Sequence, residues 1–383
     1  MQKIILSLIY LTACGFNSFA ETKLEGKLEP FLGKPELEIQ PVFKGERFGN
    51  IVVTMDGTVL ASWGTSHVRA KRSEDGGKTW GPEIVIAKPG FQPGGLTVNE
   101  SNGDIFVFIE ERHPPAPITV YKSQDDGKTW NKVDVKIKPD SNGNDPSMHM
   151  NEHGITLRHG KFKGRMIRPT RWYAGKNDRS LWPKHYTNAI YSDDGGKTWE
   201  TSDPFPAKGT GEAALVELSD GTLYYNSRRH FSTDGLNPRM RHIATSEDGG
   251  HSWGDLYVSK ELPDGEQNGN YGLMAGLIRL PFAGYDLLIF SNIESLNGRK
   301  NGTVWLSFDG GKSWPVKKSV EPKGFKYSSL AVGRKNTPSE GYISLLYESG
   351  TKSDINAYGG GKIAKFNLSW LTEGKNINQY LKK

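Results

Sequence analysis

The amino-acid sequence predicts an all-β protein built from repeated units the length of a β-propeller blade. Two observations support this. The 383 residues include 46 glycines and 21 prolines, typical of many turns, and 41 aromatic residues, which argue against a disordered chain. The pattern S-x-D-x-G-x-[ST]-W occurs five times, at intervals of 50, 69, 54 and 61 residues. Each interval fits a four-stranded blade with its loops. The five patterns begin at Ser73, Ser123, Ser192, Ser246 and Ser307.

These five boxes are expected to be turns that join two strands. Strand-like runs flank them, such as 50–60, 105–110, 224–226 and 343–347. An Asp carboxylate can accept backbone N–H groups in a tight turn, and the closing Trp is large enough to fill the space between blades. We therefore interpret the five aspartates as structural.

Two binding functions of the boxes fail on spacing. A phosphate-binding loop needs a glycine five residues before its Gly-Lys pair, and no box with Gly-Lys has one. The spacing also differs from that of a D-x-[DN]-x-[DN]-G calcium loop. We therefore expect no nucleotide or metal ion at the boxes. The residues that stand in place of the missing glycine are Arg72, Lys122, Tyr191 and Leu306.

Residues 1–20 are predicted to be an export signal. A positive start precedes the apolar run 4–11, and the small residues Ser18 and Ala20 precede Glu21 in the small-x-small pattern of a signal-peptidase site. Residues 11–14, Leu-Thr-Ala-Cys, also resemble a lipobox in which Cys14 would be lipidated, and both alternatives stay open. We expect a periplasmic, secreted or lipid-anchored protein, with membrane contact only through Cys14, the single cysteine. Elsewhere, no apolar run reaches the ~20 residues of a membrane-spanning helix.

The charge balance favours an acidic glycan as partner over nucleic acid. The 49 Lys and Arg residues exceed the 43 Asp and Glu residues only slightly, giving a net charge of +6. No run of Lys or Arg is longer than two residues, and export would separate the chain from cytoplasmic DNA. We therefore expect an acidic oligosaccharide as ligand and no nucleic-acid partner.

Five residues outside the boxes complete a resemblance to a known family. Arg47 precedes the first strand-like run, and Glu212 and Arg228 lie between the third and fourth boxes. Arg299 stands eight residues before the fifth box, and Tyr327 precedes Ser-Ser-Leu. With the boxes, these residues resemble the sialidase (neuraminidase) superfamily, whose catalytic domain is a six-bladed β-propeller with Asp-boxes.

The resemblance implies an architecture and a site. Residues 42–371 would form six blades with five Asp-boxes, between a lead-in at 21–41 and a tail at 372–383. The three arginines would bind a sugar carboxylate through their planar forks. Tyr327 would be the nucleophile, activated by Glu212 because a free phenol has a pKa of ~10. We expect a monomer without cofactor or metal.

The sequence departs from the family where its general acid should lie. The family carries an Asp between the first strand and the first box, whereas residues 64–72 contain no acidic residue and His67 stands there instead. Phe48-Gly49 replaces the usual Ile-Pro after the first arginine. Because losing a general acid typically costs ~10²- to 10⁴-fold in rate, we expect His67 to be catalytic.

Two further histidines are candidates for substrate binding. His149 and His153 lie where the family has a Gly-rich segment, so we expect one or both to face the pocket. A zinc site is not expected, because the i, i+4 spacing requires a helix, and Asn151 and Gly154 disfavour one. His113 and His230 are weaker candidates.

The missing acid leads us to favour β-elimination on a uronic acid, by a lyase or dehydratase, as in the breakdown of marine polysaccharides. Arginines on the carboxylate would acidify the C5 proton, and a His or Tyr would remove it as the C4 oxygen leaves. The alternative is an exo-α-sialidase. A second alternative is a non-catalytic acidic-glycan lectin, against which the Glu212 and Tyr327 pair argues, since carboxylate binding needs no activated phenol.

Overall fold

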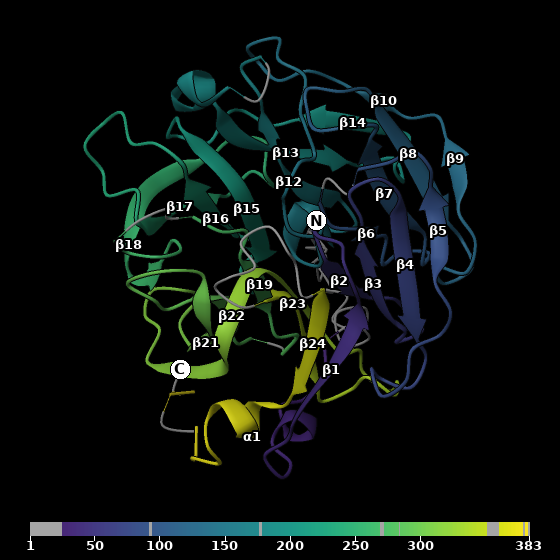
Figure 1. Cartoon of the computed structure of the whole chain (residues 1–383), viewed down its shortest axis with the longest axis vertical. Coiled ribbons are helices and arrows are strands. Elements are labelled where there is room, and N and C mark those ends of the chain that lie inside the picture. Colours follow the sequence, from purple (N-terminus) through teal and green to yellow (C-terminus); the bar gives the residue numbers. More distant parts are fainter. Residues whose placement is uncertain are drawn as a thin grey trace, which may run out of the picture.

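The computed structural model describes residues 25–381, with gaps at 92–93, 176–177, 269–271, 283, 351–359 and 378–379. The predicted export signal, the lipobox and Cys14 lie outside the described residues. Within that part of the chain, no helix is both long and apolar enough to cross a membrane. The described chain is almost entirely β-sheet, with the sheets arranged around a central axis (Figure 1).

Four of the five sheets hold one blade each. Blade 1 consists of β2 (Asn50–Val53), β3 (Val59–Trp63), β4 (Val68–Ser73) and β5 (Ile84–Ala87). Blade 2 consists of β6 (Thr97–Val98), β7 (Ile105–Glu110), β8 (Ile118–Ser123) and β9 (Asn131–Val133). Blade 3 consists of β11 (Ile155–Thr156), β12 (Met166–Trp172), β13 (Tyr186–Ser192) and β14 (Thr198–Thr201), with β10 (Lys136–Ile137) added at its edge. Blade 4 consists of β15 (Thr210–Glu217), β16 (Leu223–Arg229), β17 (Met240–Ser246) and β18 (Gly254–Pro263).

The fifth sheet has seven strands and holds blades 5 and 6, because the long strand β22 (Val316–Val332) belongs to both. The first half of β22 pairs with β21 and its second half pairs with β23. The predicted six-bladed all-β propeller is thereby confirmed. The other strands of blade 5 are β19 (Gly276–Arg279), β20 (Leu288–Ile293) and β21 (Lys300–Ser307), and those of blade 6 are β23 (Ile343–Ser349), β24 (Gly361–Phe366) and β1 (Leu37–Phe43).

The two ends of the chain close the ring in blade 6. β1, which begins inside the predicted lead-in, pairs with β24 from Leu37 opposite Phe366 to Phe43 opposite Gly361. In blades 1 to 5, a box forms the turn between the third and fourth strands. In blade 6 these two strands are β24 and β1, which no hairpin can join because they come from opposite ends of the chain. Ring closure therefore explains why six blades carry five boxes. The described helices are η2 (Glu29–Phe31), η3 (Gly160–Phe162), η4 (Arg179–Lys184) and α1 (Leu368–Leu371).

The boxes are turns stabilised by their aspartates. In the third box, Asp194 Oδ1 accepts the amide N–H groups of Lys197 at 3.0 Å and Thr198 at 2.9 Å. Trp199 is fully buried and packs edge-on against Phe108 of blade 2, with ring centroids 5.0 Å apart. The closing Trp thus fills the space between two blades, as the sequence predicts.

A buried carboxyl group, that of Glu152, connects three blades near the axis. Glu152 Oε1 accepts Ser329 Oγ and the Leu330 amide, both at 2.9 Å, and Oε2 accepts Asn50 Nδ2 at 3.0 Å. Burial raises the pKa of Glu152 to about 8. These bonds join the segment before β11 to β22 and β2, and so fix the centre of the ring from which the inner strands extend.

Candidate active site

The inner strands place different residues at the two ends of the central axis. Neighbouring segments at the axis run parallel, as between Thr97 and Gly154. A cavity of about 120 Å³ is lined by late residues of the inner strands, such as Val53, Glu217 and Val332. Arg47 and His149 precede inner strands, Glu212 comes early in β15, and Tyr327 comes early in the half of β22 that pairs with β23. These four residues therefore lie toward the other end.

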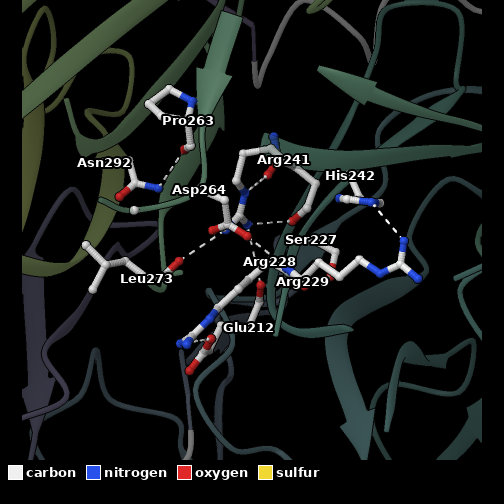
Figure 2. A network of polar contacts seen from close by, with 12 residues as sticks. Glu212, Ser227, Arg228, Arg229, Arg241, His242, Pro263, Asp264, Leu273 and Asn292 are labelled. Atoms are coloured by element: carbon white, nitrogen blue, oxygen red, sulfur yellow. Dashed lines mark hydrogen bonds and ion pairs between the residues drawn. The ribbon is translucent and has the colours of Figure 1, made fainter. Parts of the chain in front are cut away.

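Glu212 of β15 is the centre of the candidate site, and Tyr327 of β22 faces it. The Tyr327 hydroxyl donates to Glu212 Oε1 at 3.1 Å. Arg228 Nη1 of β16 lies 2.6 Å from Oε2 (Figure 2). Burial alone would raise the pKa of Glu212, but Arg228 and His230 outweigh burial and hold this pKa well below its ordinary value. Glu212 is therefore a buried carboxylate in contact with a phenol.

The three predicted arginines come from different blades and gather around Tyr327. The guanidinium carbons of Arg47 and Arg299 lie 5.2 and 5.6 Å from the centre of the Tyr327 ring. Arg228 reaches the same place through Glu212. Three fixed positive charges thus surround the phenol, an arrangement that suits an anionic ligand.

Arg47 has a carboxylate partner that no sequence motif marked. Glu348 of β23 lies with Oε1 and Oε2 at 3.3 and 3.2 Å from Nε and Nη2 of Arg47. Glu348 is buried, and it also accepts the Phe48 amide at 2.9 Å. It lies 301 positions from Arg47 in the sequence, and ring closure brings the two together.

His149 belongs to a wall of aromatic rings beside this charged centre. Its ring centre lies 4.4 Å from that of His113, 5.3 Å from Phe91 and 5.9 Å from Tyr173. Burial and the neighbouring His113 keep the pKa of His149 well below its ordinary value. His149 therefore presents a neutral imidazole.

Phe48 joins the aromatic wall to the arginines. Its ring centre lies 6.2 Å from those of both His149 and Tyr327, and the Arg47 guanidinium carbon stands 4.4 Å from it. Its backbone φ is 65°, a left-handed conformation that bulky residues rarely adopt. The hydrogen bond from its amide to Glu348 holds this conformation. Phe48 therefore shapes the site, as its place after the first arginine suggested.

The structure places His153 away from the arginines. Its Nε2 lies 3.0 Å from the Leu330 carbonyl oxygen and its Nδ1 lies 3.1 Å from that of Gly154. Its side chain lines the cavity at the other end of the axis. The geometry therefore gives no support to a part for His153 in substrate binding.

His67 lies in the partly exposed turn between β3 and β4. Within the described residues, its ring bonds Ser66 Oγ at 2.9 Å and makes no hydrogen bond, ion pair or ring contact with Tyr327 or Glu212. The same turn is attached to the site, because the Gly64 amide donates to the Arg47 carbonyl oxygen at 3.0 Å. The structure thus places the turn of His67 beside Arg47, and its catalytic role stays a prediction.

A buried ion pair between Arg241 and Asp264 contacts the backbone at Glu212 and next to Arg228 (Figure 2). Arg241 Nη1 lies 2.9 Å from Asp264 Oδ1, and both side chains are fully buried. Arg241 Nη2 donates to the backbone oxygen of Glu212 at 3.4 Å, and Asp264 Oδ2 accepts the Arg229 amide at 2.8 Å. The pair therefore fixes the backbone at both members of the Glu212–Arg228 contact. Neither Arg241 nor Asp264 belongs to a motif recognisable in the sequence.

The described residues contain no group of three or more His, Cys, Asp or Glu side chains that could hold a metal ion. The polar groups that do converge are three arginines, two carboxylates and a phenol. Their chemistry suits binding of a carboxylate and attack by the phenol oxygen.

The fold and the site together define a six-bladed propeller that gathers arginines, a tyrosine and a glutamate at one end of its axis. The chain matches the family model of the BNR repeat-like domain over residues 121–344. It belongs to this family, within the sialidase superfamily.

Two curated relatives that the chain matches are sialidases. It is 32% identical to a sialidase of Micromonospora viridifaciens over 90% of this chain and 55% of the relative, and 28% identical to a sialidase of Bacteroides fragilis over 79% of this chain and 60% of the relative. The chain thus spans little more than half the length of these relatives. The intramolecular trans-sialidase of Ruminococcus gnavus shares the fold, with a TM-score of 0.66 at 18% identity over 85% of this chain and 95% of that one. The relatives favour the sialidase alternative over β-elimination.

Proposed function

We propose that this protein is an exo-sialidase, a glycoside hydrolase that releases terminal sialic acid from a glycan. The observation that carries the proposal is the 3.1 Å contact between the Tyr327 hydroxyl and Glu212, with Arg47 and Arg299 beside the phenol ring. Sialic acid bears its carboxylate on the anomeric carbon, and arginine forks suit a carboxylate. Arginines that hold this carboxylate would bring the anomeric carbon to the Tyr327 oxygen.

The phenol must lose its proton as it attacks. Burial and the Glu212 charge raise the pKa of Tyr327, so the phenol is protonated before the reaction. As the Tyr327 oxygen bonds to the anomeric carbon, Glu212 Oε1 takes the phenolic proton, and the electrons of the breaking glycosidic bond go to the leaving oxygen. Water then attacks the anomeric carbon and displaces Tyr327, its proton goes to the group that protonated the leaving oxygen, and Glu212 returns its own proton to the phenolate.

The leaving oxygen also needs a proton, and we propose His67 as its source. The His67 turn is bonded to the backbone of Arg47, and its partly exposed ring is accessible to a glycan. Histidine is the side chain that most often serves as a general acid or base in enzymes. We expect His67→Ala to fold normally and to lose sialidase activity by ~10²- to 10⁴-fold. An alanine variant with the wild-type rate would remove His67 from the mechanism.

Release of free sialic acid from sialyl-lactose by the purified protein tests the function. We expect the wild type to release it and Tyr327→Phe to release it far more slowly. Incubation with uronate oligosaccharides is the matched test of β-elimination, because elimination forms an unsaturated uronate that absorbs ultraviolet light. Unsaturated product without sialic acid release would overturn the proposal, and glycan binding without turnover would favour the lectin alternative.

A further inference from the structure

His230 contacts the carboxylate on which the proposed reaction depends. Its Nε2 lies 3.3 Å from Glu212 Oε2, the oxygen that also has Arg228 Nη1 at 2.6 Å. The Tyr327 hydroxyl uses the other oxygen, Oε1. Glu212 therefore has Arg228 Nη1 and the His230 ring nitrogen near one oxygen and the Tyr327 hydroxyl at the other.

Neighbouring residues fix the position of the His230 ring. Trp182 of η4 packs edge-on against it, with ring centres 5.0 Å apart and planes at 88°. The His230 amide donates to the Gly209 carbonyl oxygen at 2.7 Å. At Gly211, an added Cβ would stand only 2.1 Å from His230 Nε2. A side chain at position 211 would therefore push the ring away from Glu212, so the glycine is what permits the contact.

Arg228 by itself cannot hold the Glu212 carboxylate in place throughout the proposed reaction. It is also one of the three arginines expected to hold the substrate carboxylate, so its N–H groups would be divided between two anions. His230 approaches Glu212 from the side of Trp182 and supplies a second donor. Burial and the Arg228 charge lower the pKa of His230 to about 3, so the ring is neutral, and in its Nε2–H tautomer it can donate to Glu212 without adding charge.

We propose that His230 is a positioning residue that holds the Glu212 carboxylate with Oε1 toward the Tyr327 hydroxyl. This inference rests on the proposed sialidase function. Activated nucleophiles commonly use a base that a third group orients, and a misplacement of ~1 Å can cost ~10²-fold in rate. The other titratable or charged groups that act on Glu212 are Arg228, Arg171, Tyr327, Tyr173 and His149.

The test compares His230→Leu, which removes the donor, with His230→Gln, which keeps an N–H group. For His230→Leu we expect kcat to fall on the order of 10- to 100-fold with little change in KM. The acid limb of its pH profile should move to higher pH, because Glu212 loses a donor that stabilises its charged form. His230→Gln should recover most of kcat. Gly211→Ala, which displaces the ring without replacing it, should resemble His230→Leu.

Wild-type kcat and an unmoved acid limb in His230→Leu would overturn the positioning role, as would His230→Gln being no better than His230→Leu. Thermal unfolding shows whether each variant folds, and Gly211→Ala carries the test if His230→Leu does not. The pKa of Glu212 can also be measured without turnover, by carboxyl NMR of wild type and variant. A higher pKa in the variant, with no sialic acid released by the wild type, would uphold the His230 contact and overturn the sialidase function.

Discussion

Glu212→Gln isolates the proton acceptor in the contact with Tyr327. The amide keeps the size of the carboxylate and can still accept from Arg228, but it cannot take the phenolic proton. A phenol of ordinary pKa ~10 is ionised in about one molecule in 10³ at pH ~7, and burial raises the pKa of Tyr327 above that ordinary value. We therefore expect kcat to fall by at least ~10³-fold, which corresponds to ~4 kcal/mol in the activation barrier.

Initial rates on a fluorogenic sialoside measure this loss, and thermal unfolding checks that the variant keeps its fold. Tyr327→Phe is the matched control, because it removes the nucleophile and leaves Glu212 in place. The double variant should be no slower than Tyr327→Phe alone, since residues that act as a unit are not additive. A folded Glu212→Gln enzyme with more than about a tenth of the wild-type kcat would refute the assignment of Glu212 as proton acceptor.

Three further predictions concern binding, folding and pH. Arg299→Lys should raise KM by about tenfold or more and change kcat less, because an ammonium lacks the planar fork and a charged hydrogen bond contributes ~1.5–3 kcal/mol; an unchanged KM in steady-state kinetics would contradict this. Asp194→Ala should lower the free energy of unfolding by ~1–3 kcal/mol, measured in urea, through the loss of an acceptor for two amides. Activity per folded molecule should survive, and a stable but inactive variant would show that the box is not merely structural. Burial raises the pKa of Glu152 to about 8, above its unfolded value of ~4.3, so the stability from this group is complete below pH ~4 and is lost as pH rises through 8. Glu152→Gln should therefore show a shallower loss of unfolding free energy over this range, and an equal slope in urea titrations would count against a protonated Glu152.

The fold could be predicted because its repeated turns have a local signature. An Asp-box specifies a hairpin within eight residues, so the spacing of the boxes sets the length of a blade. Ring closure has no such signature. The pairing of Leu37 with Phe366 and the sharing of β22 by two blades join segments whose sequences carry no mark of each other. The missing sixth box could be noticed in the sequence, but its cause could be seen only in the closed ring.

The site residues also divide into those with a local sequence signature and those placed by contacts between distant segments. Arg299 and Tyr327 stand at recognisable distances from boxes or motifs, and the structure brings them together. Glu348 acts through a contact between distant strands, where spacing carries no information. His230 could be named as a candidate from the sequence, but its contact with Glu212 could be seen only in the structure. His153 shares a segment with His149, yet its ring bonds backbone oxygens at the opposite end of the axis. A sequence pattern does not determine at which end of the propeller axis a side chain lies.

Three buried glutamates show how the surroundings make one of them a base. Glu110, Glu152 and Glu212 are 1%, 1% and 3% exposed, so burial by itself would raise the pKa of all three. Burial raises the pKa of Glu110 and Glu152 to about 8, whereas Arg228 and His230 hold the pKa of Glu212 well below its ordinary value. Of these three, Glu212 is therefore the one that is charged at neutral pH.

Arg228, which keeps Glu212 charged, also makes Glu212 a weak base in the free protein. When a substrate carboxylate shares Arg228, the charge that lowers the pKa of Glu212 is partly neutralised, and its affinity for the Tyr327 proton rises as the sugar binds. Substrate binding would in this way activate the nucleophile without any movement of the propeller.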